Sequence, residues 1–184
     1  DGGKDRIACP DRACGFMHFG DFSIGCSAVV LRHDDDATRA LLIQRGQDPF
    51  AGTWQVPGGY AEHDESLSLA VEREVLEESG IEAKVVDLLA LRHMSGGAVN
   101  NIYMIWRLQY VSGQPTADGE ETADAGFYSL DEMASMKGVQ NISKWGIHQA
   151  LTTNPGAGIS PALEGPGSEY PGFQLFSLVD VDAA

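Results

Sequence analysis

Residues 59–81 read GYAEHDESLSLAVEREVLEESGI, a glycine turn that leads through an acidic loop into a helical pattern. Leu67, Ala70, Val71 and Val75 recur at helical spacing, Ser66 or Asp64 can cap the start, and Gly80 stands where a helix commonly ends. We therefore expect a helix over residues 66–79 whose apolar side packs on the rest of the domain.

The same stretch concentrates negative charge. Residues 59–82 hold eight carboxylates and a single basic residue, Arg73. Glu74, Glu77 and Glu78 fall at i, i+3 and i+4, so a helix projects them from one face, about 5–6 Å apart at Cβ. Carboxylates this close repel one another unless a cation binds them, and Mg²⁺ prefers oxygen ligands of this kind. The alternative is a solvated acidic face that binds nothing.

The stretch resembles the Nudix hydrolase signature, G-x5-E-x7-R-E-U-x-E-E-x-G-U, in which U is aliphatic. Every fixed position is met, by Gly59, Glu65, Arg73, Glu74, Val75, Glu77, Glu78, Gly80 and Ile81. The preceding Trp54-Gln55-Val56-Pro57-Gly58 resembles the family's lead-in, and the layout is similar over roughly residues 16–151. The resemblance implies an α/β/α sandwich with a mixed sheet, and hydrolysis of a nucleoside diphosphate linked to another moiety, X.

The resemblance also implies roles for individual residues. The metal ligands would be Glu74, Glu77, Glu78 and the Gly59 carbonyl, and the metal Mg²⁺ or Mn²⁺, while Glu65 and Arg73 would organise the site. The general base would be Glu74 or Glu78, or an acid in the loop before Phe127, where Glu120, Glu121 and Asp124 stand; of that loop, Glu121 is our candidate.

Substrate contacts are open to several side chains. Arg45, at the end of a predicted strand, is the favoured phosphate ligand, with Arg92 and Arg107 as alternatives. Gly58 lets the backbone approach a ligand closely. Trp54 is aromatic enough to stack on a base, although aromatic residues on strands usually belong to the core. The substrate can be ADP-ribose or an ADP-sugar, an NADH-like dinucleotide, a dinucleoside polyphosphate or a nucleoside triphosphate.

The composition and net charge of the chain limit the kinds of partner and the cellular compartment that we expect. The net charge is −15, which argues against a broad basic surface for nucleic acid or an anionic membrane. No apolar run approaches the length of a membrane span. Three cysteines cannot all pair within one chain, which favours a reducing compartment, and the cytoplasm is the expected location.

The pattern along the chain predicts three segments. Residues 1–20 form an irregular arm, residues 21–152 the Nudix domain, and residues 153–184 a tail rich in glycine and proline. Within the domain we expect a hairpin of strands 23–32 and 40–44, a short extended piece at 54–56, strands 84–93 and 102–111, a strand ending at Phe127 and Tyr128, and helices 129–137 and 143–151. The tail, with its apolar stretch from Phe173 to Val179, is either flexible or packs on the domain or on a second copy, so a homodimer is one expectation.

Two cysteines in the predicted N-terminal arm are candidates for a second metal site. Residues 9–19 read CPDRACGFMHF and resemble the second half of the zinc ribbon that precedes the domain in NADH pyrophosphatase-like members. Cys9 and Cys14 are separated by four residues, more than the usual two, and no first pair stands upstream. A metal-free remnant is therefore favoured over zinc.

A second functional hypothesis is a Nudix-like domain that senses an ADP-ribose-type ligand without cleaving it. Such domains would be expected to lose carboxylates of the signature, and this chain retains all of them. Hydrolysis is therefore the leading hypothesis.

Overall fold

The computed structural model describes residues 6–11, 13–18, 21–95, 100–162 and 175–178. Its elements are, in chain order, β1 (Phe22–His33), β2 (Thr38–Arg45), β3 (Trp54–Gln55), α1 (Leu67–Ser79), β4 (Ile81–Met94), β5 (Asn100–Gly113), β6 (Thr122–Tyr128), α2 (Leu130–Ser135), α3 (Asn141–Thr152), β7 (Ile159–Ala162) and β8 (Leu175–Leu178). The strands predicted from alternating apolar residues are present, and most extend a residue or more beyond the predicted ends.

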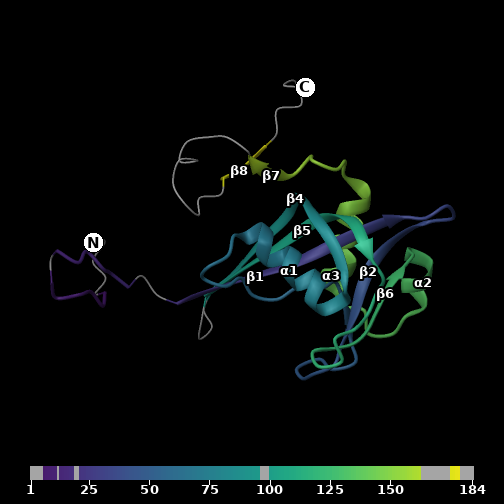
Figure 1. The fold of residues 1–184 in the computed structure, drawn as a ribbon, viewed down its shortest axis with the longest axis horizontal. Helices are drawn as coiled ribbons and strands as arrows, with labels where there is room; N and C mark the ends of the chain where they lie inside the picture. Colours follow the sequence, from purple (N-terminus) through teal and green to yellow (C-terminus); the bar gives the residue numbers. More distant parts are fainter. Residues whose placement is uncertain (1–5, 12, 19–20, 96–99, 163–174, 179–184) are drawn as a thin grey trace.

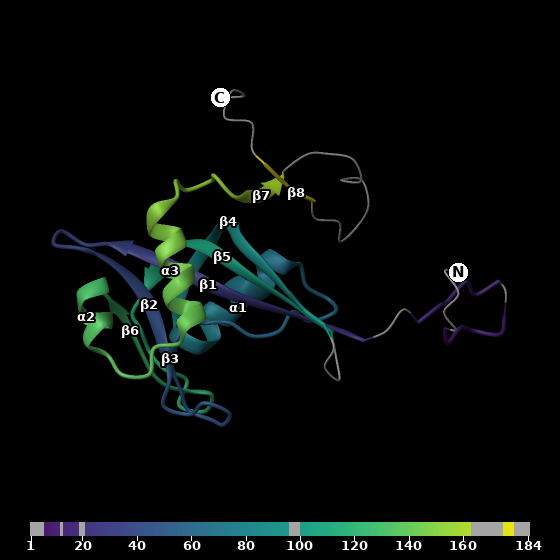
Figure 2. The ribbon, with the colours of Figure 1, turned by 180° about the vertical axis from the view of Figure 1, so that it is seen from behind.

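The strands form one mixed sheet in the order β3-β2-β1-β5-β4-β7-β8, with β6 paired to β2. β1 and β2 make the predicted antiparallel hairpin, whereas β1 and β5 run parallel. Helix α1 covers one face of the sheet and α3 the other (Figures 1 and 2). The expected α/β/α sandwich is confirmed.

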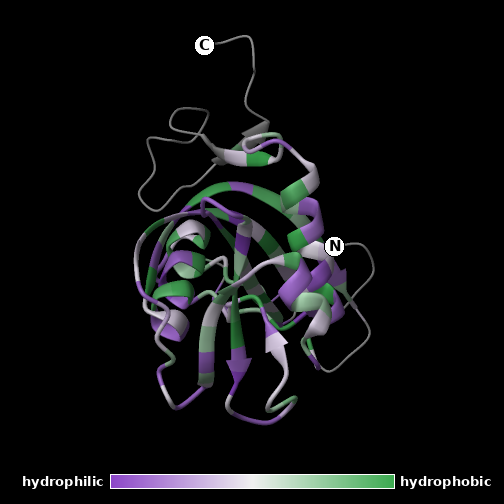
Figure 3. Cartoon of the chain, turned by 90° about the vertical axis from the view of Figure 1, so that its right-hand side faces the viewer, coloured by the Kyte–Doolittle hydropathy of each residue, from purple (hydrophilic) through white to green (hydrophobic). Residues whose placement is uncertain are grey.

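Each face of the sheet has its own hydrophobic core. On the α1 side, Val71 and Val75 pack with buried strand residues such as Trp106. On the α3 side, Ile147 packs with Val29 and Ile105. Both helices alternate between hydrophobic and hydrophilic residues along their length, as helices that bury one side do (Figure 3). The position of α1 is thus fixed by the side of the helix that carries no signature carboxylate.

The ends of α1 follow the local signals in the sequence. The Ser66 hydroxyl accepts a hydrogen bond from the Leu69 N–H at 3.3 Å, which satisfies a donor that the first turn leaves free. Gly80 adopts a left-handed conformation with φ of 67°, and its N–H donates to the Leu76 carbonyl. Because Gly80 ends the helix sharply, β4 begins at the next residue and lies directly beside α1.

A buried ion pair joins the sheet to the segment after α3. Asp87 is 0% exposed, and its carboxylate accepts from Arg107 Nε at 3.1 Å and from the backbone N–H of Gly156 at 2.7 Å. Arg107 Nη1 donates in turn to the Thr153 carbonyl at 2.8 Å. Arg107, an alternative phosphate ligand in the sequence, is therefore committed to the fold.

The tail packs back on the domain where it is described. β7 pairs with β4 through Ile159 and Leu88, and β8 pairs with β7. Phe176 stacks on Trp106 with ring centroids 5.1 Å apart. Phe173, Gln174 and Val179 of the predicted apolar stretch lie outside the described residues. None of the helices in the described ranges is long and apolar enough to cross a membrane.

Replacing Asp87 with alanine should lower the free energy of unfolding by about 3–5 kcal/mol, because Arg107 would keep a buried charge without its partner. Urea denaturation followed by circular dichroism measures the change. Asp35→Ala, at an exposed position, is the control and should change stability by less than about 0.5 kcal/mol. Equal effects of the two substitutions would contradict the assigned role of the ion pair.

Candidate metal and substrate site

The glycine turn before α1 lies directly against β1. The Gly59 carbonyl accepts from the Cys26 N–H at 2.8 Å, and the Pro57 carbonyl accepts from Ala28 at 2.9 Å. A Cβ added at Gly58 would overlap the Cys26 carbonyl, and one added at Gly59 would lie 2.5–2.6 Å from the carboxylate of Glu74. Only glycines allow the turn to pass between β1 and the helix.

Two signature carboxylates lie under this turn, the Glu78 side chain buried and the Glu74 side chain 13% exposed. Glu78 is 6% exposed and accepts from the Gly58 N–H at 2.7 Å. The pKa of Glu78 is raised to about 8, chiefly by burial and in smaller part by the negative charges of Glu74 and Glu121. Burial is also the largest cause of the raised pKa of Glu74. The fold thus holds two acids where their negative charge is unfavourable, a cost that a bound cation would offset.

Arg73 connects the acidic loop to the helix. Its guanidinium binds Glu65 through two hydrogen bonds, from Nε at 3.0 Å and from Nη2 at 2.7 Å. Its Nη1 donates to Glu74 at 2.9 Å and to Glu77 at 2.8 Å. The hydrogen bond from Arg73 is the largest cause of the lowered pKa of Glu65. Arg73 thus links Glu65 to Glu74 and Glu77, and the organising role that the resemblance implies for Glu65 and Arg73 stays a prediction.

Glu77 differs from the other two helix carboxylates. Its side chain is 58% exposed and turns to Arg73. In the described parts of the chain, no group of three or more His, Cys, Asp or Glu side chains is arranged to hold a metal ion. Glu74, Glu78 and the Gly59 carbonyl, which has a second lone pair free, supply the hard oxygen donors that Mg²⁺ prefers, so the donor set fits the metal. Glu77 would join this donor set if its carboxylate left Arg73 and bound the cation instead.

Residues from β2 and β6 approach the same carboxylates. The Gly46 N–H donates to the Glu121 carbonyl at 2.7 Å, which holds the start of β6 beside the end of β2. The positive charge of Arg45 lowers the pKa of Glu78, whereas the charge of Glu121 raises the pKa of both Glu74 and Glu78. Arg45 Nε donates to the Pro49 carbonyl at 3.0 Å. The structure thus brings Arg45 and Glu121 to the helix carboxylates, and Gly46 is a site residue that the sequence pattern missed.

Trp54 lies elsewhere. Its ring packs edge-on against Tyr128 with centroids 5.3 Å apart, within the α3-side core. Trp54 is half-buried there, and its packing against the α3-side core is the arrangement usual for an aromatic residue on a strand. Its role as a stacking surface for a base stays a prediction.

The arm brings the two cysteines into one turn. Ala8 and Met17 form a β-bridge, and the Cys14 N–H donates to the Asp11 carbonyl at 3.1 Å. Cys9 and Cys14 are both free thiols. Zinc binding by this pair stays a prediction.

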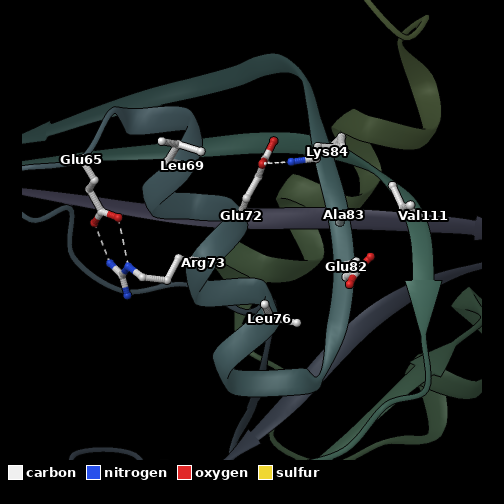
Figure 4. A pocket seen from close by; sticks show the side chains of 9 residues that line it. All are labelled: Glu65, Leu69, Glu72, Arg73, Leu76, Glu82, Ala83, Lys84 and Val111. Atoms are coloured by element: carbon white, nitrogen blue, oxygen red, sulfur yellow. Dashed lines mark hydrogen bonds and ion pairs between the residues drawn. The ribbon is translucent and has the colours of Figure 1, made fainter. Parts of the chain in front are cut away.

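A groove of about 370 Å³ lies on the outer side of α1, away from the buried carboxylates (Figure 4). Leu69 and Leu76 of the helix line it, together with Val111 of β5. The Glu65–Arg73 pair stands at its rim, and Glu74 and Glu78 are not among its lining residues. The groove therefore belongs to the back of the helix and is distinct from the candidate metal site.

The sequence matches a family model over residues 24–148, the model described as the NUDIX domain. The chain belongs to the Nudix family. It is 41% identical over 71 residues to a protein named putative nudix hydrolase 1 of Caenorhabditis elegans, a match to 39% of this chain and 20% of that protein. It is 26% identical to the NAD-capped RNA hydrolase NudC of Stutzerimonas stutzeri, over 84% of this chain and 52% of that protein.

Solved structures agree with the fold. A MutT NUDIX hydrolase of Burkholderia pseudomallei superposes with a TM-score of 0.58 at 26% identity, over 70% of this chain and 98% of that one. A NUDIX hydrolase of Nitrosomonas europaea gives 0.64 at 20% identity, over 84% of this chain and 86% of that one, and at this identity shows the fold alone. The chain spans about half of the NudC relative.

Glu78→Gln should weaken Mn²⁺ binding at least tenfold without lowering the stability of the metal-free protein. The amide oxygen still accepts the Gly58 N–H, while the buried negative charge is removed. Calorimetric titration with Mn²⁺ and thermal unfolding measure the two effects. Glu62→Gln, at an exposed loop position, is the control and should leave both unchanged. A large loss of stability in Glu78→Gln would contradict this account of the site.

Proposed function

We propose that this protein hydrolyses a pyrophosphate bond in a nucleoside diphosphate linked to another moiety, and that the reaction depends on Mg²⁺ or Mn²⁺. The observation that carries the proposal is the pair formed by the buried Glu78 and the largely buried Glu74, held against the Gly58-Gly59 turn inside a complete Nudix signature. Burying two acids with raised pKa values is unfavourable for a domain with no cation to bind. Relatives named as hydrolases support the reaction class.

In the proposed mechanism, residues of the chain bind the cation and the substrate, orient the metal ligands and accept a proton from the attacking water. Glu74, Glu78 and the Gly59 carbonyl would hold the cation, and Glu77 would join them on leaving Arg73. When bound, Mg²⁺ neutralises the pyrophosphate and lowers the pKa of a coordinated water. The Gly58 N–H keeps Glu78 in place, and Arg73 keeps Glu65 and Glu74 in place. The two Nη groups of Arg45 have no partner among the described residues, which leaves them free for a phosphate.

Glu121 is the proposed general base. Glu74 and Glu78 are assigned to the metal, whereas Glu121 is exposed and its charge reaches both of them. A carboxylate beside the cation, but not among its ligands, can accept the proton of the attacking water. The negative charge of Asp124 instead raises the pKa of Tyr128, so Glu121 is favoured over Asp124 as the general base.

Small nucleotides are the proposed substrates, and the cytoplasm the proposed location. The net charge of −15 opposes binding of a long polyanion. One relative is named an ADP-ribose pyrophosphatase, of Methanocaldococcus jannaschii, at 31% identity over 103 residues. The alternative, a sensor that binds an ADP-ribose-type ligand without cleaving it, is disfavoured because every signature carboxylate is retained.

A substrate screen tests the proposal. Nucleotide sugars, ADP-ribose, dinucleotides, dinucleoside polyphosphates, nucleoside triphosphates and NAD-capped RNA are incubated with Mg²⁺ or Mn²⁺, and product phosphate is measured after a phosphatase couple. We expect cleavage of at least one small nucleotide and none after chelation of the metal. Calorimetric binding of ADP-ribose without any product would support the sensor instead. Cleavage of the capped RNA alone would overturn the substrate class.

Glu121→Gln should lower kcat by about 10²–10⁴-fold, with little change in KM, because it removes the base but leaves the metal ligands in place. Steady-state kinetics on the substrate found in the screen measure the loss. Glu120→Gln, at the neighbouring exposed position, is the matched control and should retain activity. Equal activity of Glu121→Gln and Glu120→Gln would contradict this assignment and leave Glu74 or Glu78 as the general base.

A further inference from the structure

The arginines of this protein differ in how their charge is compensated. Arg32, Arg39, Arg73 and Arg107 form ion pairs with Asp or Glu. Arg45 and Arg92 form no ion pair within the described residues, and their hydrogen bonds go to neutral oxygens. In a chain with 27 acidic residues and a net charge of −15, such arginines keep a positive charge that is open to a ligand. Arg45 already has a place in the proposed site, and Arg92 does not.

Arg92 is oriented by two neutral neighbours. Its Nη2 donates to the Asn101 side-chain oxygen at 2.8 Å, and its guanidinium carbon lies 4.9 Å from the centroid of the Tyr103 ring. Asn101 is buried and donates through Nδ2 to the Ser23 hydroxyl at 3.0 Å. The guanidinium is thus held in place while its remaining N–H groups have no partner in the described ranges. A planar donor prepared in this way matches the oxygens of a phosphate.

The position of Arg92 connects it to the metal ligands. β5 pairs Tyr103 with Gly25 of β1 on one side and with Arg92 of β4 on the other. β1, β5 and β4 run side by side (Figure 1). A Cβ added at Gly25 would lie 2.7 Å from Tyr103 Cδ2 and 3.6 Å from the Gly59 carbonyl oxygen. The Tyr103 ring thus has the Arg92 guanidinium over it and approaches β1 at the residue that lies against the Gly59 carbonyl.

Electrostatics support the same arrangement. The pKa of Tyr103 is raised first by burial, and the hydroxyl experiences the negative charge of Glu78 and the positive charge of Arg92 together. Tyr103 therefore lies between a metal ligand and the uncompensated arginine. In the strand order, Arg45 on β2 and Arg92 on β4 stand on different sides of β1.

We propose that Arg92, oriented by Asn101 and Tyr103, binds an anionic group of the substrate that lies beyond the scissile pyrophosphate. The inference rests on the proposed function and names the substrate class more closely. A nucleoside triphosphate or a dinucleoside polyphosphate reaches both Arg45 and Arg92, whereas an ADP-sugar with an uncharged X reaches only one of them. Arg92 thus selects for substrates with three or more phosphates or with a phosphate on X.

Binding of inorganic tripolyphosphate in the presence of Ca²⁺, measured by calorimetry, tests the inference. Arg92→Ala should raise Kd at least tenfold, and Arg92→Lys should raise it less, because lysine keeps the charge but loses the planar donors. The matched control is Lys84→Ala, which removes one exposed positive charge from the same strand and should change Kd less than threefold. Equal Kd values for Arg92→Ala and Lys84→Ala would overturn the inference.

Kinetics separate binding from general damage to the site. Arg92→Ala should raise KM for a nucleoside triphosphate at least tenfold, raise KM for ADP-ribose less than threefold, and leave kcat within threefold for both. A fall in kcat at constant KM, or equal changes in KM for the two substrates, would contradict a role in selecting the anion. If the wild type cleaves neither these compounds nor any other nucleotide of the screen, the proposed hydrolysis fails, while the tripolyphosphate comparison still decides the role of Arg92.

Discussion

The close approach of the Gly58-Gly59 turn to β1 is the constraint on which the site depends. The turn uses its carbonyl to pair with Cys26 and its N–H to hold Glu78, so the same short segment is part of the sheet and part of the site. A side chain at either glycine would push the turn off β1 or displace Glu74. The burial of the two carboxylates is therefore a consequence of backbone packing, because the helix that carries them is fixed by its apolar side and cannot move away.

Arg73 reduces the electrostatic cost of gathering so many carboxylates in one segment. It is the only basic residue in the 59–82 segment and bonds three of its carboxylates, which offsets part of their mutual repulsion. The arrangement is uneven, because Glu65 takes the two-pronged contact and Glu77 an exposed one. Exposed ion pairs contribute little stability, so Glu77 is the ligand that a cation can recruit at low cost.

Local patterns in the sequence predicted much of the fold. The helix over residues 66–79, its caps and the hairpin of β1 and β2 follow from residue spacing and turn chemistry, and the mixed sheet between helices follows from the family resemblance. Partners far apart in sequence could not be read in this way. Asp87 and Arg107 sit on strands with unremarkable alternation, and nothing local shows that they meet, or that Gly156 joins them.

The site shows the same division. Spacing placed Glu74, Glu77 and Glu78 on one helix face, but burial separates Glu77 from the other two, and burial depends on how the turn packs. Trp54 has the chemistry of a stacking residue, and the fold packs part of its side chain against the α3-side core, which its local sequence does not show. Family resemblance supplied Glu121 as a candidate, whereas its reach to Glu74 and Glu78 is a property of the pairing between β2 and β6.

Charge compensation gives a criterion that the sequence alone lacks. A chain this acidic has carboxylates available for its arginines, and those that fasten the fold, such as Arg107 with Asp87, use them. Arg92, whose guanidinium contacts an amide and an aromatic ring, is fixed in position but keeps an uncompensated positive charge, since neither partner carries a charge. An anionic substrate approaching a negative protein is repelled until it meets cations, and in the proposed site those would be the metal and the arginines that form no ion pair within the described residues. Which phosphates the site accepts then depends on where these positive charges stand relative to the metal, and strand order sets that geometry.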